Sequence, residues 1–394
     1  MSTHIGPPAK GSNFFGRTKM IDRIKNVISK GTHILLSAPR RVGKTSLAMR
    51  ILYLIQKENW NGIYVTLEGA KDETIVAQRI ISALKDQESL WKKTKDSFIS
   101  MFKSANIEID AFGAKIKYTH NDNSVEQLLE TLGKAINQMK GNFLVVLDEL
   151  PVFLASLETK EDGIARVETM LNVLRSFRQY DNGEEYDVKD KKVWFFCGSI
   201  SLENYAAQRN LSYTINDIKP YKLGAYDQEE TIDFLRLAAK RSMIDLDSEV
   251  SNHIISKVGW PIPFYLAIVF DAAMNEMADK TMTIVHVDEG YKKALEEHKK
   301  DFDLWIQRLQ LHIKDAEIHI EFLKLIAKGK SVNLEFLKAF ILGSEWSNTK
   351  ELQILDILDQ LESDGYIVLE NQVYQFRSPL IRDYIIQKFH IALP

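Results

Sequence analysis

The residues with the clearest chemistry are Gly43, Lys44, Thr45 and Ser46, which follow a turn-rich segment and open a helical pattern. An apolar run at 34–36 precedes them, so the expected order is strand, loop and helix. This is the order of a P-loop, in which backbone N–H groups and the start of the helix surround phosphate oxygens. A chance Gly-Lys-Thr at a helix start is the alternative, and the preceding strand disfavours it. We therefore expect a nucleotide-phosphate site.

Several residues of this loop have an expected role. Lys44 is expected to reach the β- and γ-phosphates, and the Thr45 hydroxyl to hold Mg²⁺. Gly43 permits the close backbone approach that phosphate binding needs. Ala38 replaces the first glycine of the usual motif, so this position must keep a φ that is open to alanine. The residues expected to bind the nucleotide here are Ala38, Pro39, Arg40, Arg41, Val42, Gly43, Lys44, Thr45 and Ser46.

Two carboxylates, Asp148 and Glu149, form the second informative motif. The apolar run 143–147 precedes them, as in a strand that is buried on both faces of a parallel sheet. Ligands of open α/β sheets bind at the carboxyl ends of such strands. Asp148 is expected to bind Mg²⁺, and Glu149 to polarise the attacking water as a general base.

Another buried strand is expected over 193–197, and it ends in Gly198 and Ser199. Ser199 could sense the γ-phosphate or the attacking water from the strand beside Asp148. A simple turn at the end of the strand is the alternative interpretation.

Two further turns could lie near a nucleotide base. Phe15-Gly16-Arg17 stands upstream of the loop, before an amphipathic helix that caps the sheet, and the turn itself could lie near adenine. Gly259-Trp260-Pro261 precedes an apolar helix over 264–274. It either caps that helix or, as part of a lid, presses on the base or ribose.

Three arginines are candidates for a finger that reaches a neighbouring subunit's phosphate: Arg166, Arg175 and Arg178. A solvated position on an amphipathic helix is the simpler interpretation of each. Residues 159–162 fit a loose guanine motif, but they do not follow a late buried strand. Adenine is therefore favoured over guanine.

The composition predicts a soluble protein of two or three domains. The chain has 394 residues, of which 45% are hydrophobic and 27% charged, enough for sizeable cores. The formal charge of −3 gives no global attraction to nucleic acid. The one cysteine, Cys197, lies in an apolar run, which excludes a disulfide framework or thiolate cluster. The sequence shows neither a signal peptide nor a membrane span, so we expect a cytoplasmic protein.

Four segments are expected along the chain. Residues 1–13 are rich in Pro, Gly and Ser and predict a flexible N-terminus. Residues 14–222 predict an α/β core, with an alternating hairpin inserted at about 106–119. Residues 223–312 predict a helical lid. Short helices followed by a hairpin over 313–394 predict a winged-helix domain.

Charge argues against DNA reading by this C-terminal segment. From Ala316 onward the sequence holds 8 basic and 11 acidic residues. Its expected recognition helix carries Glu351, Asp356, Asp359 and Glu362. Because Lys and Arg contacts to phosphate dominate DNA affinity, a protein-contacting or regulatory role is favoured.

These residues together resemble the archaeal-type ATPases of the STAND (signal-transduction) class of P-loop NTPases, relatives of replication-initiator ATPases. The resemblance rests on FGR at 15–17, APRRVGKTS at 38–46, LDE at 147–149, GS at 198–199, GWP at 259–261 and FRSPLIRDY at 376–384. It implies an AAA+-like core with strand order 5-1-4-3-2, a helical lid and a winged helix. It also implies binding of ATP and Mg²⁺, slow hydrolysis, and positions for Arg17 and Pro261 near the base or ribose.

Three functions are compatible with these features. The preferred one is an ATP-binding and ATP-hydrolysing switch that couples the Mg–ATP state to a protein effector or to self-assembly. Some relatives end in a nuclease domain that is lacking here, so the effector is expected to be a separate protein. The second is an initiator-like, ATP-dependent DNA-binding protein. The third is an interaction scaffold that holds ATP only structurally.

Overall fold

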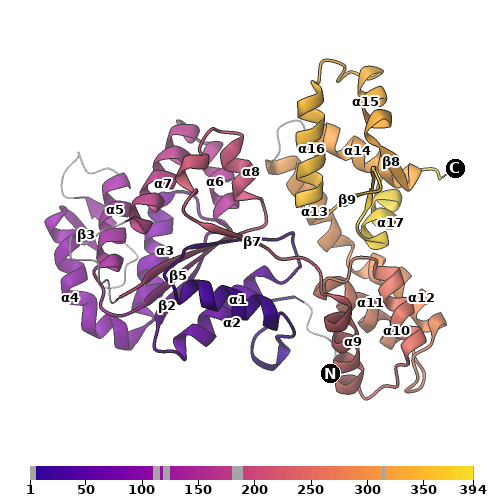
Figure 1. The fold of residues 1–394 in the computed structure, drawn as a ribbon, viewed down its shortest axis with the longest axis horizontal. Coiled ribbons are helices and arrows are strands. Elements are labelled where there is room, and N and C mark those ends of the chain that lie inside the picture. The colour runs from indigo at the N-terminus through magenta and orange to yellow at the C-terminus, as the bar shows by residue number, and fades with distance from the viewer. Residues whose placement is uncertain (1–5, 110–115, 119–124, 180–189, 313–315, 394) are drawn as a thin grey trace. The chain divides into compact units, whose positions relative to one another are not determined.

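The computed structural model describes residues 6–109, 116–118, 125–179, 190–312 and 316–393. The chain divides into two compact units, shown in Figure 1. The first, here called the sheet unit, comprises Thr18–Ala38 and Lys44–Leu223. The second, the helical unit, comprises Met1–Arg17, Pro39–Gly43 and Gly224–Pro394. No described helix combines the length and apolarity that a membrane crossing requires.

The sheet unit is built on one parallel five-stranded sheet of order β2-β5-β6-β1-β7. This is the order that the family resemblance implies, with the loop strand β1 between β6 and β7. The α/β fold class predicted from the sequence is thereby confirmed. The strands are β1 (Ile34–Ser37), β2 (Asn61–Thr66), β5 (Phe143–Asp148), β6 (Lys192–Gly198) and β7 (Lys219–Lys222).

Helices cover both faces of this sheet (Figure 1). One face is covered by α1 (Thr18–Ile28) and α2 (Lys44–Gln56). The helices on the other face are α3 (Glu73–Lys85), α5 (Val125–Asn137), α6 (Leu150–Glu158) and α7 (Gly163–Arg178). Burial on both faces explains why β5 reads as an unbroken apolar run, with all six residues buried.

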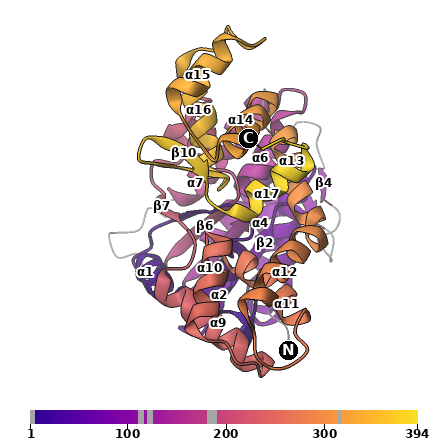
Figure 2. The same cartoon turned by 90° about the vertical axis from the view of Figure 1, so that its right-hand side faces the viewer.

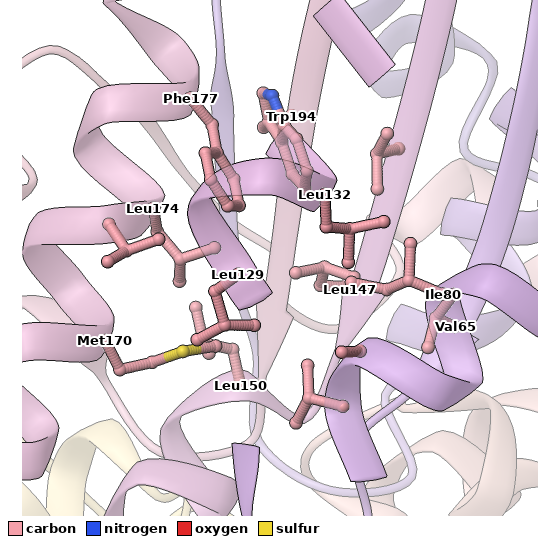
Figure 3. Packing of buried hydrophobic residues seen from close by; sticks show 14 of the residues in the cluster. Val65, Ile80, Leu129, Leu132, Leu147, Leu150, Met170, Leu174, Phe177 and Trp194 are labelled. Carbon is pink, nitrogen blue, oxygen red and sulfur yellow. The ribbon is translucent and has the colours of Figure 1, made fainter. Parts of the chain in front are cut away.

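The main core lies between the sheet and the second set of helices (Figure 3). Leu147 and Trp194 project from the strands toward Leu132 of α5 and Phe177 of α7. Gly133 lets α5 approach α7, since a Cβ at this position would lie 2.0 Å from the Phe177 ring. The close packing fixes the strands whose ends carry the candidate site.

An insertion between α3 and α5 contains α4 (Glu88–Ser104) and a short hairpin. The hairpin strands, β3 (Ile107–Ile109) and β4 (Ile116–Tyr118), pair antiparallel, as their alternation predicts. Residues 110–115, between these two strands in the chain, lie outside the described residues, as do residues 180–189.

The largest segment of the helical unit, Gly224–Pro394, opens with a run of helices (Figure 2). Asp227 and Asp247 cap the first two, because each side chain accepts the backbone N–H three residues ahead. The helices are α9 (Gln228–Ser242), α10 (Ser248–Val258), α11 (Pro263–Asn275), α12 (Ile284–Glu297) and α13 (Lys299–His312).

The last segment has the element order of a winged helix: helix, strand, two helices, two strands and a final helix. Its three strands form an antiparallel sheet of order β8-β10-β9. The elements are α14 (Ala316–Gly329), β8 (Ser331–Asn333), α15 (Leu334–Leu342), α16 (Glu351–Ser363), β9 (Ile367–Glu370), β10 (Val373–Phe376) and α17 (Pro379–Lys388). The division into a lid over 223–312 and a winged-helix domain over 313–394 stays a prediction.

Candidate nucleotide-binding site

Strand ends of the sheet unit bring the candidate residues together. In β5-β6-β1, neighbouring strands are parallel, so their carboxyl ends share one edge of the sheet. Asp148 ends β5, Ser199 follows β6, and Lys44 begins α2 after the loop that follows β1. Residues distant in the sequence therefore meet at this edge.

The Asp148 carboxylate is held by three donors. Thr45 Oγ1 donates to Oδ2 over 2.6 Å, and the Tyr64 hydroxyl donates to the same oxygen over 2.8 Å. The backbone N–H of Glu149 donates to Oδ1 over 3.0 Å. With only 2% of its surface exposed, Asp148 is fixed in one orientation. Sequence analysis missed Tyr64, because a tyrosine in a strand carries no motif signal.

The Glu149 carboxylate is held by Lys44 and Ser199. Lys44 Nζ lies 2.8 Å from Oε1. The Ser199 hydroxyl and backbone N–H donate to Oε2 over 2.8 and 3.0 Å. The three residues predicted from separate motifs therefore form one cluster, although their roles in chemistry stay predictions.

Opposite charges stabilise this buried pair. Burial alone would lower the pKa of Lys44, but the charges of Glu149 and Asp148 outweigh it and raise that pKa. Burial alone would raise the pKa of Glu149, but Lys44 and then Ser199 lower it. Both groups are therefore charged near neutral pH.

Local backbone geometry places Glu149 beside Ser199. Glu149 has the left-handed conformation, with φ of 60°, immediately before α6 and its Pro151. Gly198 permits this arrangement, since a Cβ there would lie 2.4 Å from the Pro151 ring.

Cys197 is fully buried, and burial raises the pKa of its thiol well above the usual value. The thiol is therefore inert at neutral pH.

The loop between β1 and α2 contains two residues with positive φ. Arg41 has φ of 63° and Gly43 has φ of 100°, a value suited to glycine. Ala38 is not among the positive-φ residues, so alanine replaces glycine there without strain. Val42 is buried, and Ser46 lies in the first turn of α2.

The loop tip, Pro39–Gly43, belongs to the helical unit. Within that unit, Arg41 forms an ion pair with Asp301 and lies 4.9 Å from the centre of the Phe264 ring. A Cβ on Gly365 would lie 2.8 Å from Pro39. Arg41 is thus in contact with α11 and α13, and Pro39 is close to the turn between α16 and β9.

The pKa of Asp364 is affected by this arrangement. Burial raises the pKa of Asp364 to about 7, and the charge of Arg40 opposes the shift. Arg40 therefore has a carboxyl near it, as Arg41 has.

The two residues expected near the base lie around Tyr226 in the helical unit. The Arg17 guanidinium is 4.3 Å from the centre of the Tyr226 ring and donates to the carbonyls of Gly224 and Ala225. The Pro261 carbonyl accepts the Tyr226 N–H over 3.1 Å. The Arg17 guanidinium is thus in contact with residues 224–226. If Arg17 affects binding of the base, we expect it to do so by holding this segment in place.

The three arginine-finger candidates have partners within the sheet unit. Arg166 pairs with Glu73 over 2.5 Å, and Arg178 with Asp217 over 2.8 Å. Arg175 donates to the Tyr213 carbonyl over 2.5 Å. These contacts give each arginine a structural role.

The donor set fits Mg²⁺. This cation prefers hard oxygens and is usually bound by one or two protein ligands together with phosphates and water. Thr45 gives its hydroxyl proton to Asp148, which leaves the hydroxyl oxygen's lone pairs for a cation. Elsewhere in the described part of the chain, no three His, Cys, Asp or Glu side chains gather as a metal site.

Comparisons with known proteins agree with this geometry. Residues 17–181 match the family model described as "ATPase: KaiC". The matched range contains the loop after β1 and the two carboxylates at the end of β5, and it supports a P-loop ATPase. No curated protein sequence matches the chain.

The fold of the chain is similar to those of archaeal proteins of known structure. The Walker-type ATPase PABY2304 of Pyrococcus abyssi is 14% identical, with a TM-score of 0.67 over 98% of this chain and 99% of that one. The ORC2 protein of Aeropyrum pernix, in ADPNP–ADP complexes, is 16% identical, with a TM-score of 0.54 over 97% of this chain and 98% of that one. The predicted resemblance to archaeal ATPases and initiators is thus confirmed as a likeness of fold.

Proposed function

We propose that this ATPase binds ATP with Mg²⁺, hydrolyses it slowly, and uses the nucleotide state as a STAND-type switch coupled to a protein partner or to self-assembly. The observation that carries this proposal is the cluster of Lys44, Thr45, Asp148, Glu149 and Ser199 at one edge of the sheet. It supplies a cation for phosphate, oxygens for Mg²⁺ and a candidate base.

The Lys44–Glu149 pair links phosphate binding to release of the base. Lys44 Nζ engages one oxygen of Glu149, so a phosphate must compete with that oxygen for the ammonium group. Once Lys44 turns toward phosphate, Glu149 Oε1 is free to accept a proton from water. Ser199 continues to hold Oε2 and keeps the carboxylate oriented. When bound, Mg²⁺ would neutralise phosphate charge, with Thr45 and Asp148 holding it.

The loop-tip contacts support a further step in this switch. Phosphate oxygens would compete with Asp301 for Arg41, because guanidinium groups bind both kinds of anion. The pair is about one-third exposed on the Arg41 side, so its contribution is modest.

Asp301→Asn is therefore expected to tighten ATP binding by about threefold, as measured by titration calorimetry. Asp303→Asn is the matched control, because Asp303 lies on the same helix but bonds to Tyr384 and Lys388. An unchanged dissociation constant in Asp301→Asn, or equal tightening in both variants, would remove this competition.

Limited proteolysis tests the switch itself. We expect different cleavage patterns with ATP and ADP, because the two nucleotides would stabilise different arrangements of the chain. Sedimentation of the same samples distinguishes self-assembly from a change within one chain. If the cleavage patterns and the sedimentation are identical with ATP and with ADP, the switch is refuted, although ATP hydrolysis itself is not.

Exposed apolar side chains on α15 and α16 are candidates for contact with a protein partner. Lys338 links α15 to α16 through Glu351, and these two helices expose Phe336, Leu342 and Leu352 by 51%, 73% and 70%. Apolar side chains exposed together mark contact surfaces, so we propose that these helices meet the partner.

The alternative function, an initiator-like ATP-dependent DNA-binding protein, is supported only by likeness of fold. On α16, Glu351, Asp356 and Asp359 face solvent, which opposes contact with phosphate. A fluorescence anisotropy titration with duplex DNA and ATP at low salt distinguishes the two. Binding that weakens steeply with salt would favour the alternative function.

A further inference from the structure

Tyr64 is a half-buried polar residue in the middle of β2, between the buried residues Ile63 and Val65. Its hydroxyl lies 2.8 Å from Asp148 Oδ2, the oxygen that also accepts the Thr45 hydroxyl. Two neutral donors therefore converge on one carboxylate oxygen at the expected Mg²⁺ site.

The alternation of side chains along β2 explains why Tyr64 lies on the same side of the sheet as Thr45. Ile63 and Val65 pack in the main core with α3 and α5. Gly62 lies on the opposite face, where a Cβ would meet Leu52 of α2. Because side chains alternate along a strand, Tyr64 lies on the Gly62 side, the face from which α2 presents Thr45.

We propose that Tyr64 is a positioning residue that orients the Asp148 carboxylate for the Mg–nucleotide complex. The inference rests on the proposed function, because it concerns the same site. Tyr64 would hold Oδ2 while Glu149 N–H holds Oδ1, so that the carboxylate cannot rotate. Groups that hydrogen-bond to a metal-binding side chain fix its orientation in this way and change the affinity for the metal.

The chemistry of the phenol suits a permanent donor. A tyrosine hydroxyl is protonated at neutral pH, so it can donate a hydrogen bond without competing for the positive charge of a metal. Tyr64 makes this donation to Asp148 Oδ2 over 2.8 Å.

The test is the effect of Mg²⁺ on ATP affinity in Tyr64→Phe, which removes the hydroxyl and keeps the ring. The quantity measured is the ratio of the ATP dissociation constant in EDTA to that in Mg²⁺, obtained by titration calorimetry. We expect this ratio to fall by about tenfold, with the affinity in EDTA little changed.

Tyr205→Phe is the matched control. Tyr205 is also in the sheet unit, and its hydroxyl donates to Glu158 Oε2 over the same 2.8 Å, away from the site. Its variant loses an equivalent tyrosine–carboxylate hydrogen bond, so thermal unfolding should report similar stability for the two proteins. The ratio in Tyr205→Phe is expected to equal that of the wild type.

The outcomes separate this inference from the proposed function. If the wild type binds no ATP, the proposed function fails. If the wild type shows Mg²⁺-dependent binding but Tyr64→Phe keeps the same ratio, the role of Tyr64 is refuted. An equal fall in Tyr205→Phe, or failure of Tyr64→Phe alone to fold, would show that the hydroxyl supports the fold and does not serve the metal site.

Discussion

Glu149→Gln is expected to slow ATP hydrolysis by about 10²–10⁴-fold while ATP remains bound. Glutamine can still accept the hydrogen bonds from Ser199, so the side chain keeps its place. It cannot take a proton from water, because the amide is not a base. It also loses the ion pair with Lys44, which frees the ammonium group for phosphate. Phosphate release and equilibrium ATP binding are measured on the same preparation.

Glu158→Gln is the control for this variant. Glu158 is a carboxylate at the end of α6 that pairs with Arg209 and Tyr205, outside the site. Its variant should hydrolyse ATP at the wild-type rate. Equal turnover by Glu149→Gln and the wild type would show that Glu149 is not the general base.

Lys44→Ala is expected to weaken ATP binding by at least about 100-fold, which corresponds to roughly 3 kcal/mol of lost charge-assisted contact. The same change leaves Glu149 buried without its cation, at a cost to folding stability of about 3–5 kcal/mol. Binding must therefore be measured at a temperature where circular dichroism shows that the variant is folded.

A double variant separates the two effects of Lys44→Ala. Combining it with Glu149→Gln removes both charges, so stability should partly return while ATP binding stays lost. Lys140→Ala, an exposed lysine of the same unit, controls for general loss of positive charge. Tight ATP binding by a folded Lys44→Ala protein would mean that Lys44 does not contact phosphate.

The parts of the fold predicted best were those with strong local patterns. The apolar helix expected over 264–274 is α11, Pro263–Asn275, and the strand expected over 193–197 is β6, Lys192–Gly198. The parallel sheet followed from apolar runs that end in polar residues, because a strand buried on both faces needs such a run.

Elements with weak local patterns were missed. β7 reads Lys-Pro-Tyr-Lys and is largely exposed, so it has neither an apolar run nor alternation. It is an edge strand, where Pro220 is tolerated, and only pairing with β1 defines it. The three-residue strand β8 was missed for the same reason, since its pairing with β10 is a tertiary contact.

The sequence predicted most residues of the site but not the contacts that hold them in place. The loop and the two carboxylates carry motif signals, and the sheet brings them together as their strand ends require. Tyr64 has no such signal, because its place beside Asp148 depends on the pairing of β2 with β5. The contacts of Arg17 and Arg41 likewise depend on segments more than 200 residues away in the chain.

The central claim is that a triphosphate lies against Lys44, with its magnesium at Thr45 and Asp148. A crystal structure of Glu149→Gln with ATP and Mg²⁺ tests it most directly. The account predicts Lys44 Nζ bonded to the β- and γ-phosphates and the metal bonded to Thr45 Oγ1. Nucleotide density elsewhere on the protein, with Lys44 still in contact with residue 149, would contradict it.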